Sequence, residues 1–418
     1  MKKSLAILFA ACLLMVVMFS NVSAGKEIRF WTMPNAPAEK YDPYLKEMAE
    51  AFKKETGITV KIEVIGWDWN KVSTAVATGE GTDVTQVGTT WNPQLAATGG
   101  LSVIDINKFG GAKNFMKASY ESTLYKGKCY GVPWFAETRC LFYNKDMFAK
   151  AGVKPPKTQD ELIAVAKTIK EKLGEGKAIA IAGTNAWDII HNWAIILWSN
   201  GGQLLTADNK KAAFNSAAGI KAMEWYLSFL RLGLADKACA EYNQPQADSA
   251  FINEKAAMCY MGPWNIADIE VQNPKLNYGV VEPPVGSKGK ASFAGGSNLV
   301  ILKGSKNQKE ALQWIQFLTS KKNLTRYTKE LTHFLPPKMD AIADPYYNTG
   351  VWKVFKDTLA YATAYPPLGV WGDIEVAIST EFKNAVTAVA TGKYDENTVK
   401  NCLNAAAEKV NQALAKEK

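Results

Sequence analysis

The chain has 418 residues and a net charge of +9, from 49 Lys and Arg against 40 Asp and Glu. Its length favours two domains, each large enough to bury a core of its own. The basic residues are spread among acidic ones and form no long block, so the charge does not indicate a segment that binds nucleic acid or a membrane surface.

The N-terminus has the layout of a secretory signal peptide. A short basic head is followed by an apolar run over 5–19 and by small residues that end at Ala24. The run is shorter than the roughly 20 residues that span a bilayer. Cys12 lies inside the run rather than at its end, which argues against a lipid anchor. We therefore predict a signal peptide over 1–24, and export to the periplasm or the outer side of the cytoplasmic membrane.

Loss of this segment removes one of the six cysteines. Export permits disulfide bonds, but the odd number that remains leaves at least one thiol free or paired between chains. No spacing is CxxC, so neither a metal site nor thioredoxin-like chemistry is indicated. Cys239 and Cys259 would close a short loop, but the sequence leaves the pairing open. The others are Cys129, Cys140 and Cys402.

The first hundred residues after the signal peptide alternate between strands and helices. Apolar residues alternate in a predicted strand over 58–65, and they recur at helical spacing over 42–56, where Gly57 ends the helix. This alternation of element types indicates βαβ units and a mostly parallel sheet in an α/β fold. The other elements expected here are strands over 27–31 and 83–87 and helices over 71–78 and 93–98.

The rest of the chain has a mainly helical pattern. Two strand-like runs follow a turn at 125–128 and a third covers 256–260, whereas 285–296 is expected to be a loop. Thr158 is a predicted N-cap, and Glu161 would complete a capping box. Helices are expected over 159–173, 187–198, 218–232, 247–253, 309–320, 351–362, 374–390 and 396–414.

Common catalytic and cofactor motifs are missing from the sequence. The chain has two histidines, no HExxH and no GxSxG, and the glycine-rich stretch 286–291 departs twice from the phosphate-loop pattern. We therefore predict no metal, no cofactor and no catalytic residues.

Tryptophans follow three successive predicted strands. In open parallel sheets, ligands bind beyond the carboxyl ends of the strands. An indole face can stack on the C–H face of a sugar ring, while small polar side chains bind the hydroxyls. The candidate ligand-binding residues at these strand ends are Trp31, Asn35, Trp67, Asp68, Trp69, Thr90 and Trp91.

The tryptophans elsewhere fall into two groups. Trp264 follows a Gly-Pro pair and Trp371 lies in a segment rich in proline, so we expect both to contact the ligand. His191, at the start of a predicted helix, is equally compatible with a core and with a pocket. The tryptophans of apolar helical faces are expected in the core, namely Trp198, Trp225, Trp314 and Trp352.

Several segments recur in the order and spacing of one protein family. They include 127–133 (GKCYGVP), 143–148 (YNKDMF), 200–202 (NGG), 256–264 (AAMCYMGPW) and 277–280 (NYGV). In these segments the chain resembles the extracellular solute-binding proteins of carbohydrate ABC importers, the group that includes maltose-binding protein. The resemblance spans nearly the whole predicted mature chain.

This resemblance implies the two-lobed periplasmic-binding-protein fold of type II, with the ligand in a cleft between discontinuous α/β lobes that a three-segment hinge joins. The N-terminal lobe would comprise 25–135 and 298–344, the C-terminal lobe would comprise 140–292 and 350–418, and the hinge crossings would lie near 136–139, 293–297 and 345–349.

The resemblance also implies roles for single residues. Glu137 falls where the family has an acid that contacts sugar hydroxyls, and Trp264 falls on the family's stacking tryptophan. His191 falls near an aromatic residue that contacts ligand. Arg139 and Gly296, in the expected crossings, complete the predicted site, although the family pattern does not fix Arg139.

The function that follows is a non-catalytic receptor. It would close on a mono- or oligosaccharide and dock as a monomer on the membrane subunits of an ABC permease. One alternative is the same receptor for an acidic sugar or a polyol, in which Arg139 and lysines hold the ligand. An exported glycoside hydrolase is an alternative of another class, since such enzymes also use aromatic platforms and carboxylates.

Overall fold

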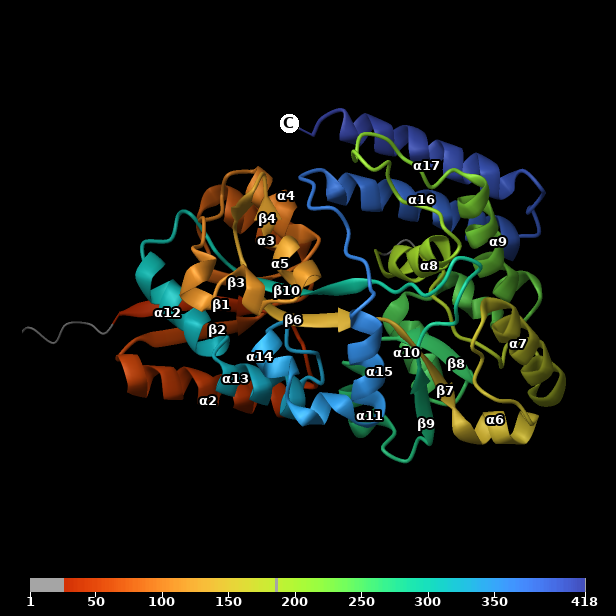
Figure 1. Ribbon diagram of the computed structural model, residues 1–418, viewed down its shortest axis with the longest axis horizontal. Helices are drawn as coiled ribbons and strands as arrows, with labels where there is room; N and C mark the ends of the chain where they lie inside the picture. The colour runs from red at the N-terminus through yellow and green to blue at the C-terminus, as the bar shows by residue number, and fades with distance from the viewer. Residues whose placement is uncertain (1–25, 185–186, 418) are drawn as a thin grey trace, which may run out of the picture.

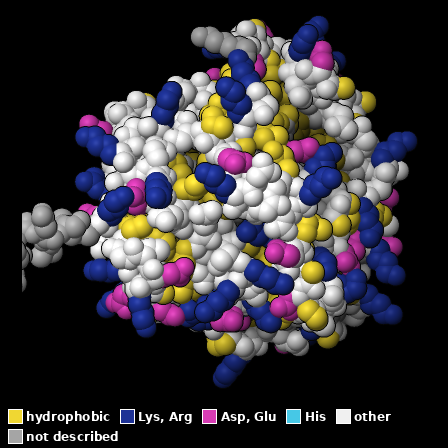
Figure 2. Space-filling model, turned by 60° about the vertical axis from the view of Figure 1, so that its left-hand side comes forward, with side chains coloured by type: hydrophobic (Ala, Val, Ile, Leu, Met, Phe, Trp, Pro, Cys, Tyr) yellow, Lys and Arg dark blue, Asp and Glu magenta, His cyan; other side chains and the backbone are white. Residues whose placement is uncertain are grey.

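A computed structural model describes residues 26–184 and 187–417 of the chain. The predicted signal peptide, with its cleavage site after Ala24, lies outside the described residues. Within them, the helices are too short or too polar to cross a membrane. Lys and Arg side chains are scattered over the face shown in Figure 2, with Asp and Glu among them, as the spread of charge along the sequence predicts.

Two main sheets lie side by side, and each has its own layer of helices (Figure 1). A third sheet consists only of the short antiparallel pair β4 (Leu124–Tyr125) and β5 (Lys128–Cys129). The larger main sheet has the strand order β2-β1-β3-β10-β6. Strand β1 pairs in parallel with β2 and β3, and β10 runs antiparallel between β3 and β6. The strands are β1 (Glu27–Thr32), β2 (Thr59–Val64), β3 (Val84–Gly88), β6 (Val132–Thr138) and β10 (Ala294–Ile301).

The predicted loop over 285–296 is confirmed up to 293, but its last three residues belong to β10. Two of these three residues are glycines, which have low strand propensity, so the sequence does not indicate a strand there. The backbone nevertheless pairs on both edges, with Gly295 opposite Glu137 and Ser297 opposite Gly88. Pairing with two neighbouring strands therefore overrides the local preference.

The five-stranded sheet and the helices around it form one half of the molecule, which we call the five-stranded half. Phe30 of β1, Phe52 of α2 and Trp314 of α12 form its core, where Trp314 packs edge-on against the two phenylalanines at 5.7 and 5.0 Å between ring centroids. The helices are α2 (Ala38–Thr56), α3 (Trp69–Thr78), α4 (Trp91–Ala97), α5 (Lys117–Glu121), α12 (Gln308–Leu318), α13 (Lys321–Arg326), a π-helix (Tyr327–Leu331) and α14 (Met339–Ile342).

The smaller main sheet is antiparallel, so the parallel arrangement expected from the first hundred residues does not extend to it. Strand β7 (Cys140–Asn144) lies between β8 (Met258–Met261) and β9 (Tyr278–Val281). The helices of this three-stranded half are α6 (Lys145–Ala151), α7 (Gln159–Leu173), α8 (Trp187–Ser199), α9 (Ala217–Arg231), α10 (Gln244–Ile252), α11 (Asn265–Gln272), α15 (Gly350–Leu359), α16 (Trp371–Ala390) and α17 (Thr398–Leu414).

Helix α7 has the predicted bounds because its N-cap forms as expected. The hydroxyl of Thr158 accepts a hydrogen bond from the backbone N–H of Glu161 at 3.1 Å. The Glu161 carboxylate, however, accepts from the N–H of Lys157 at 2.7 Å rather than from that of Thr158. The reciprocal arm of the capping box thus reaches one residue further back than predicted.

The two halves are connected through the middle of the molecule and also touch outside it. Strands β6 and β10 pair with each other where the halves meet, and β6 leads through Arg139 directly into β7 (Figure 1). At the side, the start of α16 lies against α4, where a Cβ on Gly372 would come within 2.3 Å of the Gln94 side chain. Glycine at 372 therefore permits a close approach of the two helices.

The predicted core tryptophans and the cysteines are largely internal. Trp314 is fully buried, and Trp198, Trp225 and Trp352 are partly buried against the core clusters. The five described cysteines are free thiols, so Cys239 and Cys259 do not form a bond.

Candidate functional site

A cavity of about 680 Å³ lies between the two halves. Residues far apart in the sequence meet in it, and both halves contribute. Most of the predicted site residues line it, namely Asn35, Trp67, Thr90, Trp91, Glu137, Arg139, His191, Trp264 and Gly296.

The loops that follow β1, β2 and β3 build one wall of this cavity, as the strand-end rule predicts. Trp67 lines it with 39% of its surface exposed, whereas Trp91 is 5% exposed. The two rings meet edge-on, with 5.8 Å between centroids and 79° between planes. Trp91 therefore supports Trp67, which keeps a face open to the cavity.

Asn35 lines the same wall, but its amide is already engaged. Its Nδ2 donates to Gln86 Oε1 at 2.7 Å and to the Tyr41 hydroxyl at 3.1 Å, and its Oδ1 accepts from Gln86 Nε2 at 3.1 Å. Its side chain therefore fixes the loop after β1 more than it offers free groups to a ligand.

Three predicted residues of these strand ends are not placed at the cavity. Trp31 is 8% exposed and packs toward α3, with Lys71 Nζ 4.7 Å above its ring. Successive strand residues point to opposite faces, and Trp31 faces the helix layer. Asp68 caps α3 by accepting from Lys71 N at 3.0 Å, and Trp69 packs against the Trp91 ring at 5.4 Å.

Trp371 also lies away from this cavity. It is 1% exposed, stacks on Tyr365 at 4.5 Å and donates from its Nε1 to Glu375 at 2.9 Å. The proline-rich segment before it is ordered against the start of α16, so the ring fills the core of the three-stranded half. The structure thus does not place Trp371, Trp31, Asp68 or Trp69 along this cavity, and contact of these residues with a ligand stays a prediction.

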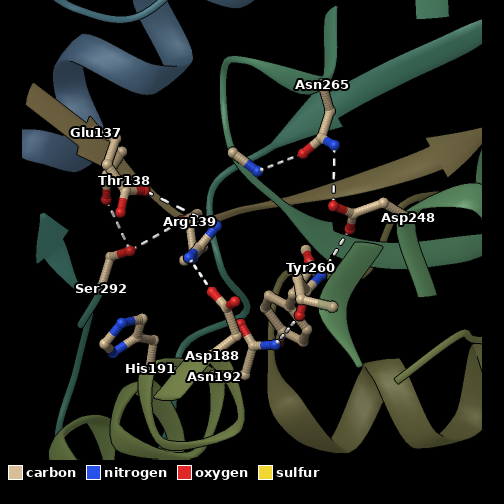
Figure 3. A network of polar contacts seen from close by, with 12 residues as sticks. Glu137, Thr138, Arg139, Asp188, His191, Asn192, Asp248, Tyr260, Asn265 and Ser292 are labelled. Carbon is tan, nitrogen blue, oxygen red and sulfur yellow. Dashed lines mark hydrogen bonds and ion pairs between the residues drawn. The ribbon is translucent and has the colours of Figure 1, made fainter. Parts of the chain in front are cut away.

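Arg139 lies where β6 passes into β7, and it is 3% exposed. Its Nη2 pairs with Asp188 Oδ1 at 2.5 Å (Figure 3). Its guanidinium lies 4.4 Å from the centre of the Trp264 ring. Its Nη1 is 3.8 Å from Glu137 Oε2. Arg139 thereby covers one face of the tryptophan that was predicted to stack on a sugar.

Three polar atoms of Arg139 and Glu137 lack hydrogen-bond partners within the described part of the chain. They are Arg139 Nε, Arg139 Nη1 and Glu137 Oε2. A buried donor or acceptor without a partner is costly. A hydroxyl group could accept from the guanidinium and donate to the carboxylate, but these atoms are buried here, so such a contact requires the side chains to shift.

Burial changes the protonation of the ionisable groups here. It raises the pKa of Glu137 to about 7, partly offset by the charge of Arg139, and it raises the pKa of Asp248 to about 7. Burial, together with the charge of Arg139, holds the pKa of His191 well below its ordinary value. His191 is therefore neutral, stacked on Phe293 at 4.0 Å and bonded through Nδ1 to the Tyr365 hydroxyl at 2.7 Å.

The opposite wall is held by a network of side-chain amides. Asp248 accepts from Gln244 Nε2 at 2.6 Å and from Asn265 Nδ2 at 2.9 Å (Figure 3). Asn265 Oδ1 in turn accepts from the N–H of Gly262 at 3.1 Å, which fixes the turn that carries Trp264. This network joins α10 to α11.

The sequence did not indicate several residues of this wall. They lie at or near the beginnings of α8, α10 and α11 rather than at strand ends, and acids in a first helical turn are a general feature that marks no ligand site by itself. These lining residues are Asp188, Asn243, Gln244, Asp248 and Asp268.

Gly296 reaches the cavity through its backbone. It has φ 138°, and a Cβ there would lie 2.1 Å from the Phe135 carbonyl oxygen. A larger residue would therefore separate β10 from β6. In the described residues, His, Cys, Asp and Glu side chains are not grouped so that three or more could bind a metal ion.

Comparisons with known proteins give a consistent result. The sequence model of the bacterial extracellular solute-binding protein family matches residues 36–324. A Brucella abortus (strain 2308) protein described in general terms as a binding protein is 30% identical over 399 residues, which cover 93% of this chain and 94% of the relative. The diacetylchitobiose binding protein of Streptomyces coelicolor is 28% identical over 386 residues, 90% of this chain and 88% of that protein.

A solved structure agrees with the fold. An ABC transporter solute-binding protein from Thermotoga lettingae, bound to alpha-D-tagatose, is 28% identical, with a TM-score of 0.83 over 93% of this chain and all of that one. The comparisons confirm both the family resemblance and the fold class inferred from the sequence.

Proposed function

This chain belongs to the bacterial extracellular solute-binding protein family, and from this premise we propose that it is a receptor of an ABC importer that binds a sugar between its two halves. The observation that carries the proposal is the cavity itself, which combines an open indole face with buried polar atoms that lack partners. The relative that binds diacetylchitobiose and the solved structure with tagatose support a carbohydrate ligand.

The chemistry of the cavity fits a sugar in two ways. The open face of Trp67 offers a surface on which the C–H face of a sugar ring can stack. After a small shift that exposes them to the cavity, the unpaired atoms of Glu137 and Arg139 can bind a hydroxyl that donates to one and accepts from the other. Both contacts come from side chains that neighbouring residues already hold in place, so little ordering is required on binding.

We further propose that the two halves are the lobes inferred from the sequence, with crossings near 136–139, 293–297 and 345–349. The paired strands β6 and β10 support the first two crossings, because they lie where the halves meet. Closure would narrow the cavity and bring both walls onto the ligand, and a ligand that contacts both walls would favour the closed form. The closed receptor would then dock as a monomer on the membrane subunits of its permease, after export directed by residues 1–24.

The site and the family bear on the two alternative functions, the receptor for an acidic sugar and the glycoside hydrolase. The acidic-sugar version depends on Arg139, whose Nη2 pairs with Asp188, while its Nε and Nη1 lack hydrogen-bond partners within the described residues, so this alternative stays open. The glycoside hydrolase alternative has no support from the family, whose members are binding proteins.

Calorimetric titration with a panel of neutral mono- and oligosaccharides tests the proposal. We expect one class of sugar to bind with a stoichiometry of one and to quench tryptophan fluorescence. Glu137→Gln should weaken binding about tenfold or more, because it replaces the charged acceptor. Lack of heat and of fluorescence change with every sugar would reject the function, and release of smaller sugars from an oligosaccharide would instead favour the hydrolase.

A further inference from the structure

The ionisable side chains of the cavity have an unexpected balance of charge. Four carboxyl groups line it, from Glu137, Asp188, Asp248 and Asp268, against the single guanidinium of Arg139. The chain as a whole has the opposite balance, with 49 basic and 40 acidic residues, and its basic side chains are scattered over the outer face (Figure 2). The cavity is thus acidic inside a basic protein.

The one basic group already holds one carboxylate, although its Nε and Nη1 lack hydrogen-bond partners within the described residues. Arg139 pairs with Asp188 at 2.5 Å, and its other recorded ion-pair contact, with Glu137, is at 3.8 Å. Asp248 accepts hydrogen bonds from uncharged amides, and Asp268 accepts one from Asn265 at 3.4 Å. Across the described part of the chain, neither Asp248 nor Asp268 has a basic side chain within ion-pair distance.

This surplus has a chemical consequence for the ligand. Carboxylates gathered in a partly dry cavity disfavour one another, and a positive charge from outside relieves both the repulsion and the cost of burial. Glu137 is 8% exposed, and its Oε2 lacks a hydrogen-bond partner within the described residues. Glu137 Oε2 is therefore a buried acceptor that an N–H or O–H group of a ligand could satisfy.

The aromatic residues of the cavity favour the same kind of ligand. The faces of tryptophan and phenylalanine rings attract cations, most strongly where water is excluded. Trp67 offers such a face on the wall opposite the carboxyl groups, and Phe135 and Phe334 also line the cavity. A neutral sugar could stack on these faces as well, but only a cation would also balance the excess negative charge of the carboxyl groups.

We propose that the ligand is an amino sugar with a free, protonated amine, and that Glu137 and Asp268 supply the negative charge that balances it. This inference rests on the proposed function as a sugar receptor and adds the class of sugar. A uronate would bring a further negative charge among the four carboxyl groups and is disfavoured by the same argument.

The test compares matched saccharides of one chain length by calorimetry between about pH 7 and pH 7.5, where Glu137 is at least half ionised and an amine of this type is still mostly protonated. The probes are glucosamine oligomers from chitosan, their N-acetylated counterparts, cello-oligosaccharides and galacturonic acid oligomers. We expect the free amine to bind at least about tenfold more tightly than each of the others, and the preference to shrink as salt is added. Equal or tighter binding of a neutral or acidic series would overturn the inference while the receptor function stands. If none of these saccharides binds but a neutral sugar of the calorimetric panel does, the inference is overturned and the receptor function stands; if no sugar of either set binds, the function itself fails.

Two variants test the residues. Asp268→Asn and Glu137→Gln should each reduce the preference for the amine over the neutral sugar about tenfold. Asp208→Asn, on an exposed loop away from the cavity, is the matched control and should leave the preference unchanged. Thermal melting of each variant shows that the fold is intact. An unchanged preference in both cavity variants would contradict the assignment.

Discussion

The two walls of the cavity differ in charge and in the elements that build them. The uncharged wall is made by residues 34–37, Trp67 and 88–91, which follow parallel strands of the five-stranded sheet. The charged wall is made by residues of α8, α10 and α11 and their caps, and it carries Asp188, Asp248 and Asp268. The difference shows how the chemistry of a wall follows from its kind of element.

Loops after parallel strands and beginnings of helices favour different residues. Short loops at strand ends can present a bulky ring at a fixed angle, and three strands deliver their loops to one edge. The beginning of a helix favours acids, because its unpaired N–H groups carry partial positive charge. Asp188 and Asp268 lie in the first turns of α8 and α11. A receptor with one wall of each type can therefore combine stacking with charge.

The largest expected effect comes from removing the guanidinium of Arg139, which pairs with Asp188 of the charged wall. Arg139→Met leaves Asp188 and Glu137 buried without their cation, and breaking a buried ion pair in this way costs about 3–5 kcal/mol of unfolding free energy. Urea denaturation measures the loss. The double variant Arg139→Met, Asp188→Asn should recover a large part of it. A single variant as stable as the original protein would show that the charged wall does not depend on this pair.

The next largest effect is expected near the uncharged wall, where replacing Trp31 or Trp67 should change the free energy of unfolding to different extents. Trp31→Ala removes a core ring and should lower the free energy of unfolding by about 3 kcal/mol. Trp67→Ala, at an exposed ring, should lower it by less than about 1 kcal/mol while weakening the sugar that binds in the calorimetric panel. Equal stability losses in both variants would show that Trp67 belongs to the core.

A smaller effect should appear as a dependence of stability on pH. Burial raises the pKa of Glu137 and of Asp248 to about 7 in the folded, ligand-free protein. Between their ordinary values and about pH 7, the folded state holds more protons than the unfolded state, so the free energy of unfolding falls as pH rises. The contribution should be roughly 1–3 kcal/mol between pH 5 and pH 8.

Chemical denaturation at several pH values measures this slope. The variant Glu137→Gln, Asp248→Asn should have a flatter profile than the original protein, whereas Asp208→Asn, at an exposed carboxylate, should not. A profile that keeps its full slope in the double variant would place the titrating groups elsewhere.

The smallest effect concerns an exposed contact between the halves. Lys40 of α2 pairs with Glu270 of α11 at 3.0 Å, and Glu270 also meets His333 Nε2 at 3.2 Å. Because both partners of the lysine pair are exposed, Lys40→Ala should cost less than about 1 kcal/mol of unfolding free energy. It should still raise the radius of gyration measured by X-ray scattering in low salt, since it removes a contact that holds the walls together. An unchanged radius would show that the pair does not influence closure.

Sequence reasoning succeeded where a residue's role depends on its near neighbours. The bounds of α7 follow from Thr158 and the glycine after Leu173, and Trp67 follows from the end of β2. Trp31 was misplaced because the strand-end rule does not say which face of the sheet the last residues point to.

Most residues of the charged wall could not be predicted from the sequence, for a different reason. Asp188 and Asp248 lie sixty residues apart, on helices that only the tertiary structure brings together, and neither has an unusual local pattern. Strand β10 was missed because its glycines are selected by the close approach of β6 and not by strand propensity. Long-range packing, rather than local preference, therefore decides these positions.

The pairing of Glu137 with Gly295 in the β6–β10 ribbon has a consequence for the order in which a ligand is captured. In the proposed closure, points near the axis of rotation travel least, and this ribbon lies at the junction of the halves. A sugar that first rests on Glu137 would keep that contact throughout the proposed closure, and it would meet the partly exposed ring of Trp67 only as the gap narrows. In this proposal Glu137 makes the first contact with the ligand and Trp67 the last.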